Sequence, residues 1–227
     1  FVLAPPRSGT TLLRVMLVGH PQLFAATELQ LLGFNNLHER RNAYCGKFSL
    51  WLEGTLRAIM EIKGCSAEEA KQLMSDYEAQ GLTTQQFYAL LQSWIGERIL
   101  VDKSPSYVLD PAALHKAEAD FDEPFYSHLV RHPYAMVRSF VSYHMDQLLY
   151  LKEHNFAPRQ LGELVWLASH QNTLDFLSKI PAQRQLRISF ETLVSQPRTV
   201  MEEFCQLMVI PFHPNLINPY HEIEKKM

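Results

Sequence analysis

Residues 1–17, FVLAPPRSGTTLLRVML, decide the fold that this sequence predicts. The apolar run at residues 1–4 is typical of a short buried strand, and the apolar spacing at residues 10–18 is typical of a helix. Between them lies a tight loop with two prolines, which fix the backbone, and with Gly9, which permits the close approach of a ligand. Backbone N–H groups at the start of a helix bind anions. The stretch therefore predicts a strand, an anion-binding loop and a helix.

The loop follows the phosphate-binding pattern GxxxxGK(S/T) without its lysine. Ala4 stands at the first glycine, Gly9 at the second, Thr10 at the lysine and Thr11 at the final hydroxyl. Loss of the lysine weakens the interpretation as a triphosphate site. The cation is instead Arg7, whose planar fork suits an anion with its charge spread over several oxygens. The loop is either a cradle for one tetrahedral anion or only a tight connection.

The rest of the chain alternates short apolar strands with helices. We expect further strands at residues 23–27, 98–101, 125–130 and 185–190, and helices at residues 134–151, 162–180 and 198–208. Residues 35–96 have a helical pattern and form either a lid or an insertion between strands. This order predicts an α/β fold that is P-loop-like, with a mostly parallel sheet, helices on both faces and a ligand site beyond the carboxyl ends of the strands.

The length of the chain indicates one domain. A chain of 227 residues buries one substantial core, so we expect residues 1–227 to form a single domain with residues 35–96 inside it. Because Phe1 already belongs to a predicted core strand, we expect the domain to have been excised from a longer, multidomain chain.

Composition excludes several classes of protein. The formal net charge of −3, from 21 Lys and Arg against 24 Asp and Glu, argues against a nucleic-acid surface. Cys45, Cys65 and Cys205 have no CxxC spacing, which favours a reducing compartment and a cytoplasmic location. No apolar run reaches the ~18 residues of a membrane span. His128 and His132 straddle a strand end instead of sharing a helical face, so we expect no metal site.

A second motif supports the first. Arg131 ends the predicted strand 125–130, and Ser139 follows eight residues later. With the loop PPRSGTT, this pair resembles the PAPS-dependent sulfotransferase family, whose 5′-phosphosulfate loop is P-x-(K/R)-(S/T)-G-(S/T)-(S/T) and whose 3′-phosphate motif is this Arg and Ser. The resemblance implies the donor 3′-phosphoadenosine 5′-phosphosulfate (PAPS), the product 3′-phosphoadenosine 5′-phosphate (PAP) and no metal. It implies donor contacts from Arg7, Ser8, Gly9, Thr10, Thr11, Arg131 and Ser139.

The same resemblance suggests roles in the chemistry. Arg7 is the candidate for neutralising charge on the sulfuryl group and the leaving phosphate. Glu28 is the leading candidate for the base that deprotonates the acceptor, although it also fits a cap of a helix starting at Leu29. Lys103 resembles the lysine of a (D/E)-K-(S/T)-P-x-Y pattern and is predicted to contact donor or acceptor oxygens. Asp102 is then its ion-pair partner or a second base.

The late segment RISFETLVSQP, residues 187–197, resembles the family's final strand and turn, where Glu191 is predicted to tie the turn structurally. The family's C-terminal loop rich in Arg, Lys and Gly is not evident after Pro211.

The acceptor is suggested by the closest resemblance within the family. The run at residues 5–34 looks like the sulfotransferase domains of modular polyketide synthases of the curacin and olefin-synthase type. These imply sulfation of a β-hydroxyl on an acyl chain carried by an acyl carrier protein, before loss of sulfate and CO2 to a terminal alkene, with neighbouring synthase domains as partners. Six apolar residues are either the lining of an acyl channel or core: Leu31, Leu32, Phe34, Phe48, Leu50 and Trp51.

Three other functions remain open at this point. The acceptor is alternatively a carbohydrate or small-molecule hydroxyl. A P-loop kinase or NTPase shares the strand, loop and helix and would use magnesium. A non-catalytic module would keep a degenerate donor site and use the helical block to dock a carrier domain.

Overall fold

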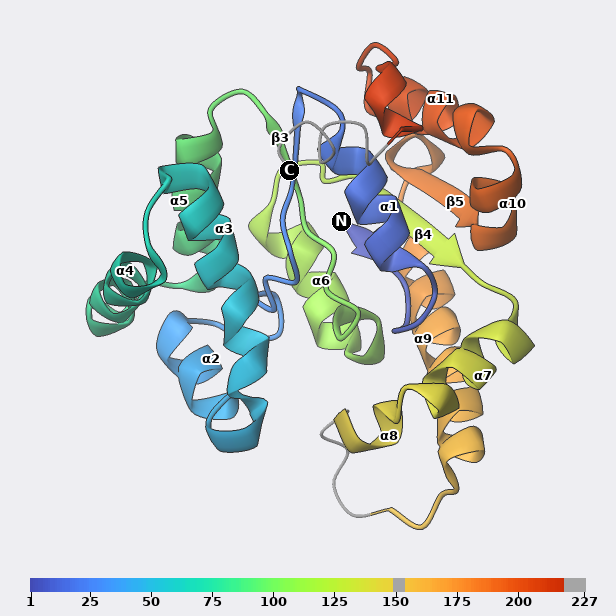
Figure 1. Ribbon diagram of the computed structural model, residues 1–227, viewed down its shortest axis with the longest axis horizontal. Helices are drawn as coiled ribbons and strands as arrows, with labels where there is room; N and C mark the ends of the chain where they lie inside the picture. Colours follow the sequence, from blue (N-terminus) through green and yellow to red (C-terminus); the bar gives the residue numbers. More distant parts are fainter. Residues whose placement is uncertain (149–153, 219–227) are drawn as a thin grey trace.

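A parallel β-sheet forms the centre of the molecule in the computed structural model, which describes residues 1–148 and 154–218 (Figure 1). Its pairs β2–β3, β1–β4 and β4–β5 are all parallel, and the Val2 N–H donates to the Asp102 carbonyl at 2.9 Å. This bond connects the two-stranded and three-stranded parts in the order β2-β3-β1-β4-β5. The strands are β1 Val2–Leu3, β2 Leu23–Ala25, β3 Ile99–Val101, β4 Tyr126–Val130 and β5 Gln185–Ser189.

Helices cover both faces of this sheet because successive strand residues point to opposite sides. Leu3 packs in an apolar cluster with residues of α6 and α9, whereas its neighbour Val2 packs in a second cluster with residues of α1 and α11. The helices are α1 Thr10–Val18, α2 Leu37–Ala43, α3 Glu53–Lys63, α4 Ala67–Ala79, α5 Thr84–Ile95, α6 Pro111–Asp120, α7 Pro133–Ser142, α8 Met145–Leu148, α9 Pro158–Leu177, α10 Phe190–Ser195 and α11 Pro197–Leu207. The predicted P-loop-like α/β fold is confirmed.

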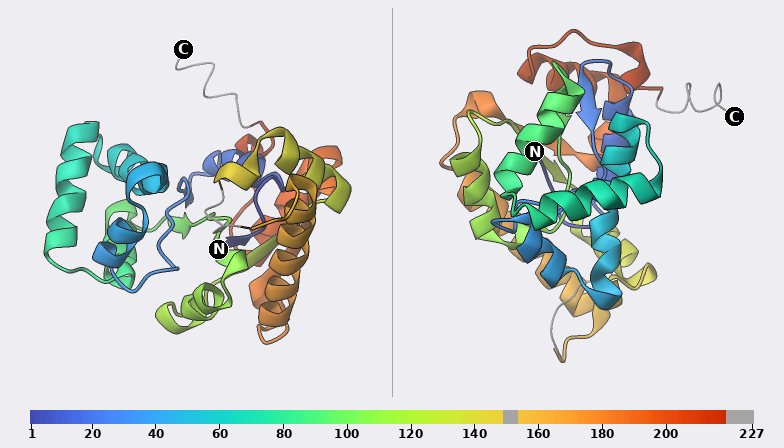
Figure 2. Two further views of the ribbon diagram at one scale, coloured as in Figure 1. Left: turned by 90° about the horizontal axis from the view of Figure 1, so that it is seen from below. Right: turned by 90° about the vertical axis from the view of Figure 1, so that its left-hand side faces the viewer.

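Helices α2 to α5 stand together at one side of the sheet, between β2 and β3 in the chain (Figure 2). Their starts are well specified, since Ser66 and Thr83 each form a capping box with the residue three positions later. Buried side chains of these helices continue the cluster that contains Leu3. The segment therefore shares a core with one face of the sheet.

The chain departs from the sequence expectation after β4. One helix was expected at residues 134–151, but α7 ends at Ser142 and α8 begins at Met145. His144 between them has a φ of 49°, a left-handed conformation that no helix continues through. Residues 149–151 of the expected helix lie outside the described residues. Two helices that the sequence did not predict, α6 and α10, complete the layers.

No helix in the part of the chain that the structure describes is long and apolar enough to cross a membrane. The three cysteines are free, with Cys45 exposed, Cys65 half-buried and Cys205 buried.

Candidate active site

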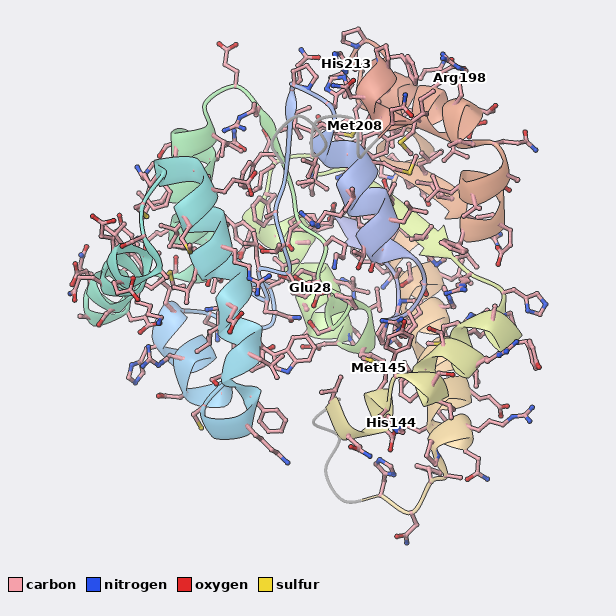
Figure 3. All side chains as sticks on the ribbon, viewed as in Figure 1. Glu28, His144, Met145, Arg198, Met208 and His213 are labelled. Carbon is pink, nitrogen blue, oxygen red and sulfur yellow. The ribbon has the colours of Figure 1, made fainter. Side chains whose placement is uncertain are left out.

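The predicted site residues meet at one edge of the sheet because parallel strands end there together. The first loop follows β1, Glu28 follows β2, Lys103 follows β3 and Arg131 directly follows β4. A cavity of about 370 Å³ opens at this edge. Glu28 and Met145 line it from different elements and are labelled in Figure 3. Other lining residues are Arg7, Thr10, Thr11 and Trp51.

The first loop has a backbone that only some residues tolerate. Arg7 has a φ of 66° and Gly9 a φ of 91°. A Cβ on Gly9 would lie 2.1 Å from the Phe190 ring, so both the backbone angle and the packing require glycine. Ser8 is fully buried, and its Oγ has no hydrogen-bond partner among the described residues. A buried hydroxyl without a protein partner is available to hydrogen-bond a ligand.

The second motif contacts this loop directly. Arg7 Nε donates to Ser139 Oγ at 3.0 Å, and Arg131 Nη1 donates to the Arg7 carbonyl at 2.8 Å. The Arg131 guanidinium also lies 4.5 Å from the centre of the Phe190 ring. Its Nε is buried and has no partner within residues 1–148 and 154–218. The structure thus brings the two predicted anion-binding motifs together and leaves polar atoms of both unpaired.

The turn that carries Arg131 is held from two sides. Trp166 Nε1 donates to the Arg131 carbonyl at 3.0 Å. The His132 N–H donates to Glu191 Oε1 at 3.0 Å, which confirms the structural role predicted for Glu191. Partial burial acts to raise the pKa of Glu191, but the hydrogen bonds that it accepts outweigh burial and lower this pKa.

Glu28 and Lys103 form an ion pair, with Lys103 Nζ 2.6 Å from Glu28 Oε1. The lysine side chain is 5% exposed and the glutamate side chain 32% exposed, so the carboxylate is the partner that faces the cavity. The first helix after β2 begins at Leu37, hence the alternative role of Glu28 as a cap for a helix at Leu29 is wrong.

Helix α3 packs closely against the backbone of Glu28. A Cβ on Gly54 would lie 1.8 Å from the Glu28 carbonyl oxygen. Thr27 Oγ1 donates to the Gly54 carbonyl at 2.9 Å, which fixes the two segments together. The sequence did not predict the role of Gly54, because no neighbouring residue shows that the Glu28 backbone packs against this glycine.

Asp102 does not have either of the roles predicted for it. It is 2% exposed and accepts hydrogen bonds from Tyr88 Oη at 2.5 Å, Tyr107 Oη at 2.8 Å and Ser104 Oγ at 2.9 Å. Burial raises the pKa of Asp102 despite these bonds. The partner of Lys103 is Glu28, and Asp102 is the centre of a buried network under the site.

A buried arginine supports the loop after β2. Arg40 is 1% exposed, and its Nε donates to the Gln30 carbonyl at 3.0 Å while Nη2 donates to Thr55 Oγ1 at 3.2 Å. Burial lowers the pKa of Arg40. Gln30 has a φ of 53°, so the arginine stabilises an unfavourable turn close to Glu28. The sequence gives no sign that this arginine is buried.

The six apolar residues expected to be channel lining or core differ in burial, and Phe34 and Phe48 are half-buried. Leu31 and Leu32 are 0% and 1% exposed and belong to the core, so for these two residues the core alternative is confirmed. Leu50 is 48% exposed. Trp51 lines the cavity.

His128 pairs with a residue that the sequence did not suggest. Its Nε2 lies 2.8 Å from His170 Nδ1, and both rings are buried. Burial lowers the pKa of His128 to about 3 and that of His170 to about 4, so both rings are neutral at pH 7. Within the described residues, no group of three or more His, Cys, Asp or Glu side chains is placed to hold a metal ion.

Comparisons with known proteins agree with this fold. The model of the sulfotransferase family matches residues 1–214. The sulfotransferase domain from the curacin biosynthetic pathway has 44% identity and a TM-score of 0.90, over 97% of this chain and 77% of that one. The sulfotransferase domain from the Synechococcus PCC 7002 olefin synthase has 38% identity and a TM-score of 0.89, over 97% and 76%.

A more distant structure shares only the fold. The sulfotransferase from Alicyclobacillus acidocaldarius has 13% identity and a TM-score of 0.59, over 95% of this chain and 86% of that one. No curated protein sequence matches the chain.

Proposed function

Because the chain belongs to the sulfotransferase family, we propose that it transfers a sulfuryl group from PAPS to an alcohol. The observation that carries the donor assignment is the contact between the two anion-binding motifs, where Arg131 bonds the Arg7 carbonyl at 2.8 Å. Membership of this family removes the P-loop kinase or NTPase as a candidate.

The residues present fit such a donor. The buried Ser8 Oγ and Arg131 Nε lack partners among the described residues, and phosphate oxygens are the acceptors that such donors bind. We assign the 5′-phosphosulfate to Arg7, Ser8, Gly9, Thr10 and Thr11, and the 3′-phosphate to Arg131 and Ser139. PAPS supplies an activated sulfuryl group and leaves as PAP, with no metal in the scheme.

In the proposed reaction, Glu28 accepts the proton of the acceptor hydroxyl. The acceptor oxygen forms a bond to sulfur while the bond between sulfur and the bridging phosphate oxygen breaks, and its electron pair leaves with PAP. Lys103, paired with Glu28 at 2.6 Å, holds the carboxylate toward the cavity, and Arg7 neutralises the charge that develops on the leaving oxygens.

We propose as acceptor the β-hydroxyl of an acyl chain on an acyl carrier protein, ahead of decarboxylative elimination to a terminal alkene. The two similar domains come from the curacin pathway and an olefin synthase, which supports this choice. Carrier protein and neighbouring polyketide synthase domains are then the partners. The free cysteines support a cytoplasmic location. The second candidate is a carbohydrate or small-molecule hydroxyl.

The experiment that tests the acceptor offers labelled PAPS with a β-hydroxyacyl carrier protein, a simple sugar and a phenol. We expect label on the carrier protein. Transfer to the sugar or phenol alone would reject the polyketide assignment and keep the enzyme class.

A second titration tests the donor and the enzyme class. PAP is expected to bind without metal and more tightly than ATP with magnesium. Tight PAP binding without transfer to any acceptor would instead favour a non-catalytic module that docks a carrier domain.

A further inference from the structure

We propose that Tyr143 is a positioning residue that holds the Arg7 guanidinium for sulfuryl transfer, an inference that rests on the proposed function. The Arg7 Cζ lies 3.8 Å from the centre of the Tyr143 ring. This is within the distance at which an aromatic face attracts a guanidinium. Neither the loop motif nor the Arg131 and Ser139 motif includes this tyrosine.

Helix α7 provides two contacts to the same guanidinium. Ser139 and Tyr143 are four residues apart, and residues at this spacing lie on one face of a helix. Ser139 Oγ accepts from Arg7 Nε at 3.0 Å, while the Tyr143 ring packs against the guanidinium. The serine fixes one edge of the planar group and the tyrosine fixes its plane.

The remaining donors of Arg7 are left for a ligand. Within residues 1–148 and 154–218, neither terminal nitrogen of Arg7 has a hydrogen bond to the protein. Arg7 also lines the cavity beside Thr10 and Glu28. The contacts that orient the guanidinium thus leave both terminal nitrogens for end-on, bidentate binding of oxygens.

Tyr143 lies at the end of α7, outside the core. Tyr143 follows the last residue of α7, and the positive φ of His144 turns the chain away into α8. The ring is 61% exposed, so it is not part of the core and contributes little to folding through burial. An exposed aromatic ring that packs on a site arginine indicates a role in the site.

The test compares Tyr143→Leu with Tyr143→Phe. Leucine removes the aromatic face, so kcat should fall about 3- to 30-fold, as expected for loss of one cation–π contact. Phenylalanine keeps the face and should retain most of the rate. PAP keeps the 5′-phosphate that we assign to Arg7, so its affinity is measured beside kcat and should fall by no more than kcat does. Tyr134→Leu, which removes an exposed tyrosine of the same helix, is the matched control.

Two readouts separate positioning from a general structural role. In an Arg7→Ala background, Tyr143→Leu should cause no further loss of rate, because the contact is already absent. The Arg7 Nε–H signal of the free wild-type protein, followed by NMR, should carry a ring-current shift that Tyr143→Phe keeps and Tyr143→Leu loses. This second readout requires no activity.

Three outcomes would overturn the inference: wild-type kcat in Tyr143→Leu, equal losses with and without Arg7, or an Arg7 signal unaffected by leucine. If the wild-type protein binds PAP but transfers no sulfuryl group, the proposed function is rejected instead. The NMR comparison would still test the contact between Arg7 and Tyr143.

Discussion

Arg131 donates a hydrogen bond to the backbone carbonyl of Arg7 over 2.8 Å, although 124 positions separate the two residues in the chain. The arginine at the end of β4 therefore supports the loop after β1 as well as facing the proposed donor site. The bond links the loop that we assign to the 5′-phosphosulfate with the arginine that we assign to the 3′-phosphate. This contact depends on the pairing of β1 with β4, which puts the two strand ends side by side.

Arg131→Ala should weaken PAP binding by about 1–3 kcal/mol, the cost of leaving a hydrogen-bonding group without its partner. The substitution removes both the proposed contact with the charged 3′-phosphate and the hydrogen bond to the Arg7 carbonyl. Isothermal titration calorimetry measures it directly. Arg159→Ala, which removes an exposed arginine paired with Glu163 on α9, is the control and should bind PAP like the wild type. Equal affinities in all three proteins would remove Arg131 from the donor site.

Glu28→Gln should lower kcat by roughly 10²–10⁴-fold, the usual contribution of a positioned base. Glutamine keeps the size of the side chain but accepts no proton at neutral pH. PAP affinity should stay at the wild-type value, since no donor contact is assigned to this residue. Single-turnover transfer of labelled sulfuryl measures the chemical step, and Glu163→Gln on α9 is the control. An unchanged rate would mean that another group takes the proton.

The sequence was sufficient for the parts of this site that depend on local chemistry. Helix α1 begins and ends where its apolar spacing predicts, and Gly9 occupies the left-handed position that the loop requires. Arg131 stands at the end of a strand because the mostly buried stretch Tyr126–Val130 stops there. Each of these features is determined by neighbours along the chain.

The features that the sequence missed depend on contacts between distant segments. Lys103 pairs with Glu28 and not with the adjacent Asp102, because β2 and β3 are neighbours and their ends present both side chains to one another. No proline or glycine marks the break at His144, so the helical periodicity predicted one continuous helix through it. The buried Arg40 looks like a surface residue in the sequence, since nothing near it in the chain marks its carbonyl partners.

Gly54→Ala tests the contact of α3 with Glu28. Glycine to alanine in a helix usually stabilises by about 1 kcal/mol. At Gly54 we expect alanine to destabilise the protein instead, because the new Cβ would lie 1.8 Å from the Glu28 carbonyl oxygen. The loop that carries Glu28 must then move. The expected result is a lower kcat with PAP affinity preserved, together with a lower thermal midpoint.

Gly33→Ala is the matched control for this change, since no atom lies within 4 Å of the Cβ that it would add. Wild-type turnover in Gly54→Ala would show that Glu28 tolerates displacement by α3, or that Glu28 is not the base.

The buried pair His128 and His170 should make the protein less stable in mild acid. Both pKa values are lowered by burial, to about 3 and about 4, so the folded protein keeps neutral rings while the unfolded chain takes up protons below its ordinary pKa near 6.5. The stabilisation is therefore complete above about pH 6.5 and is lost as the pH falls toward 4. Each histidine should contribute about 1.4 kcal/mol of lost stability per pH unit in this window.

Urea unfolding at pH 7.5, 6 and 5 measures this slope. His170→Gln keeps a hydrogen-bonding partner for His128 and removes one titrating group, so the free energy of unfolding should fall less steeply with decreasing pH. His132→Gln, at an exposed position, is the control and should reproduce the wild-type slope. Identical slopes in wild type and His170→Gln would show that His170 takes up its proton without unfolding.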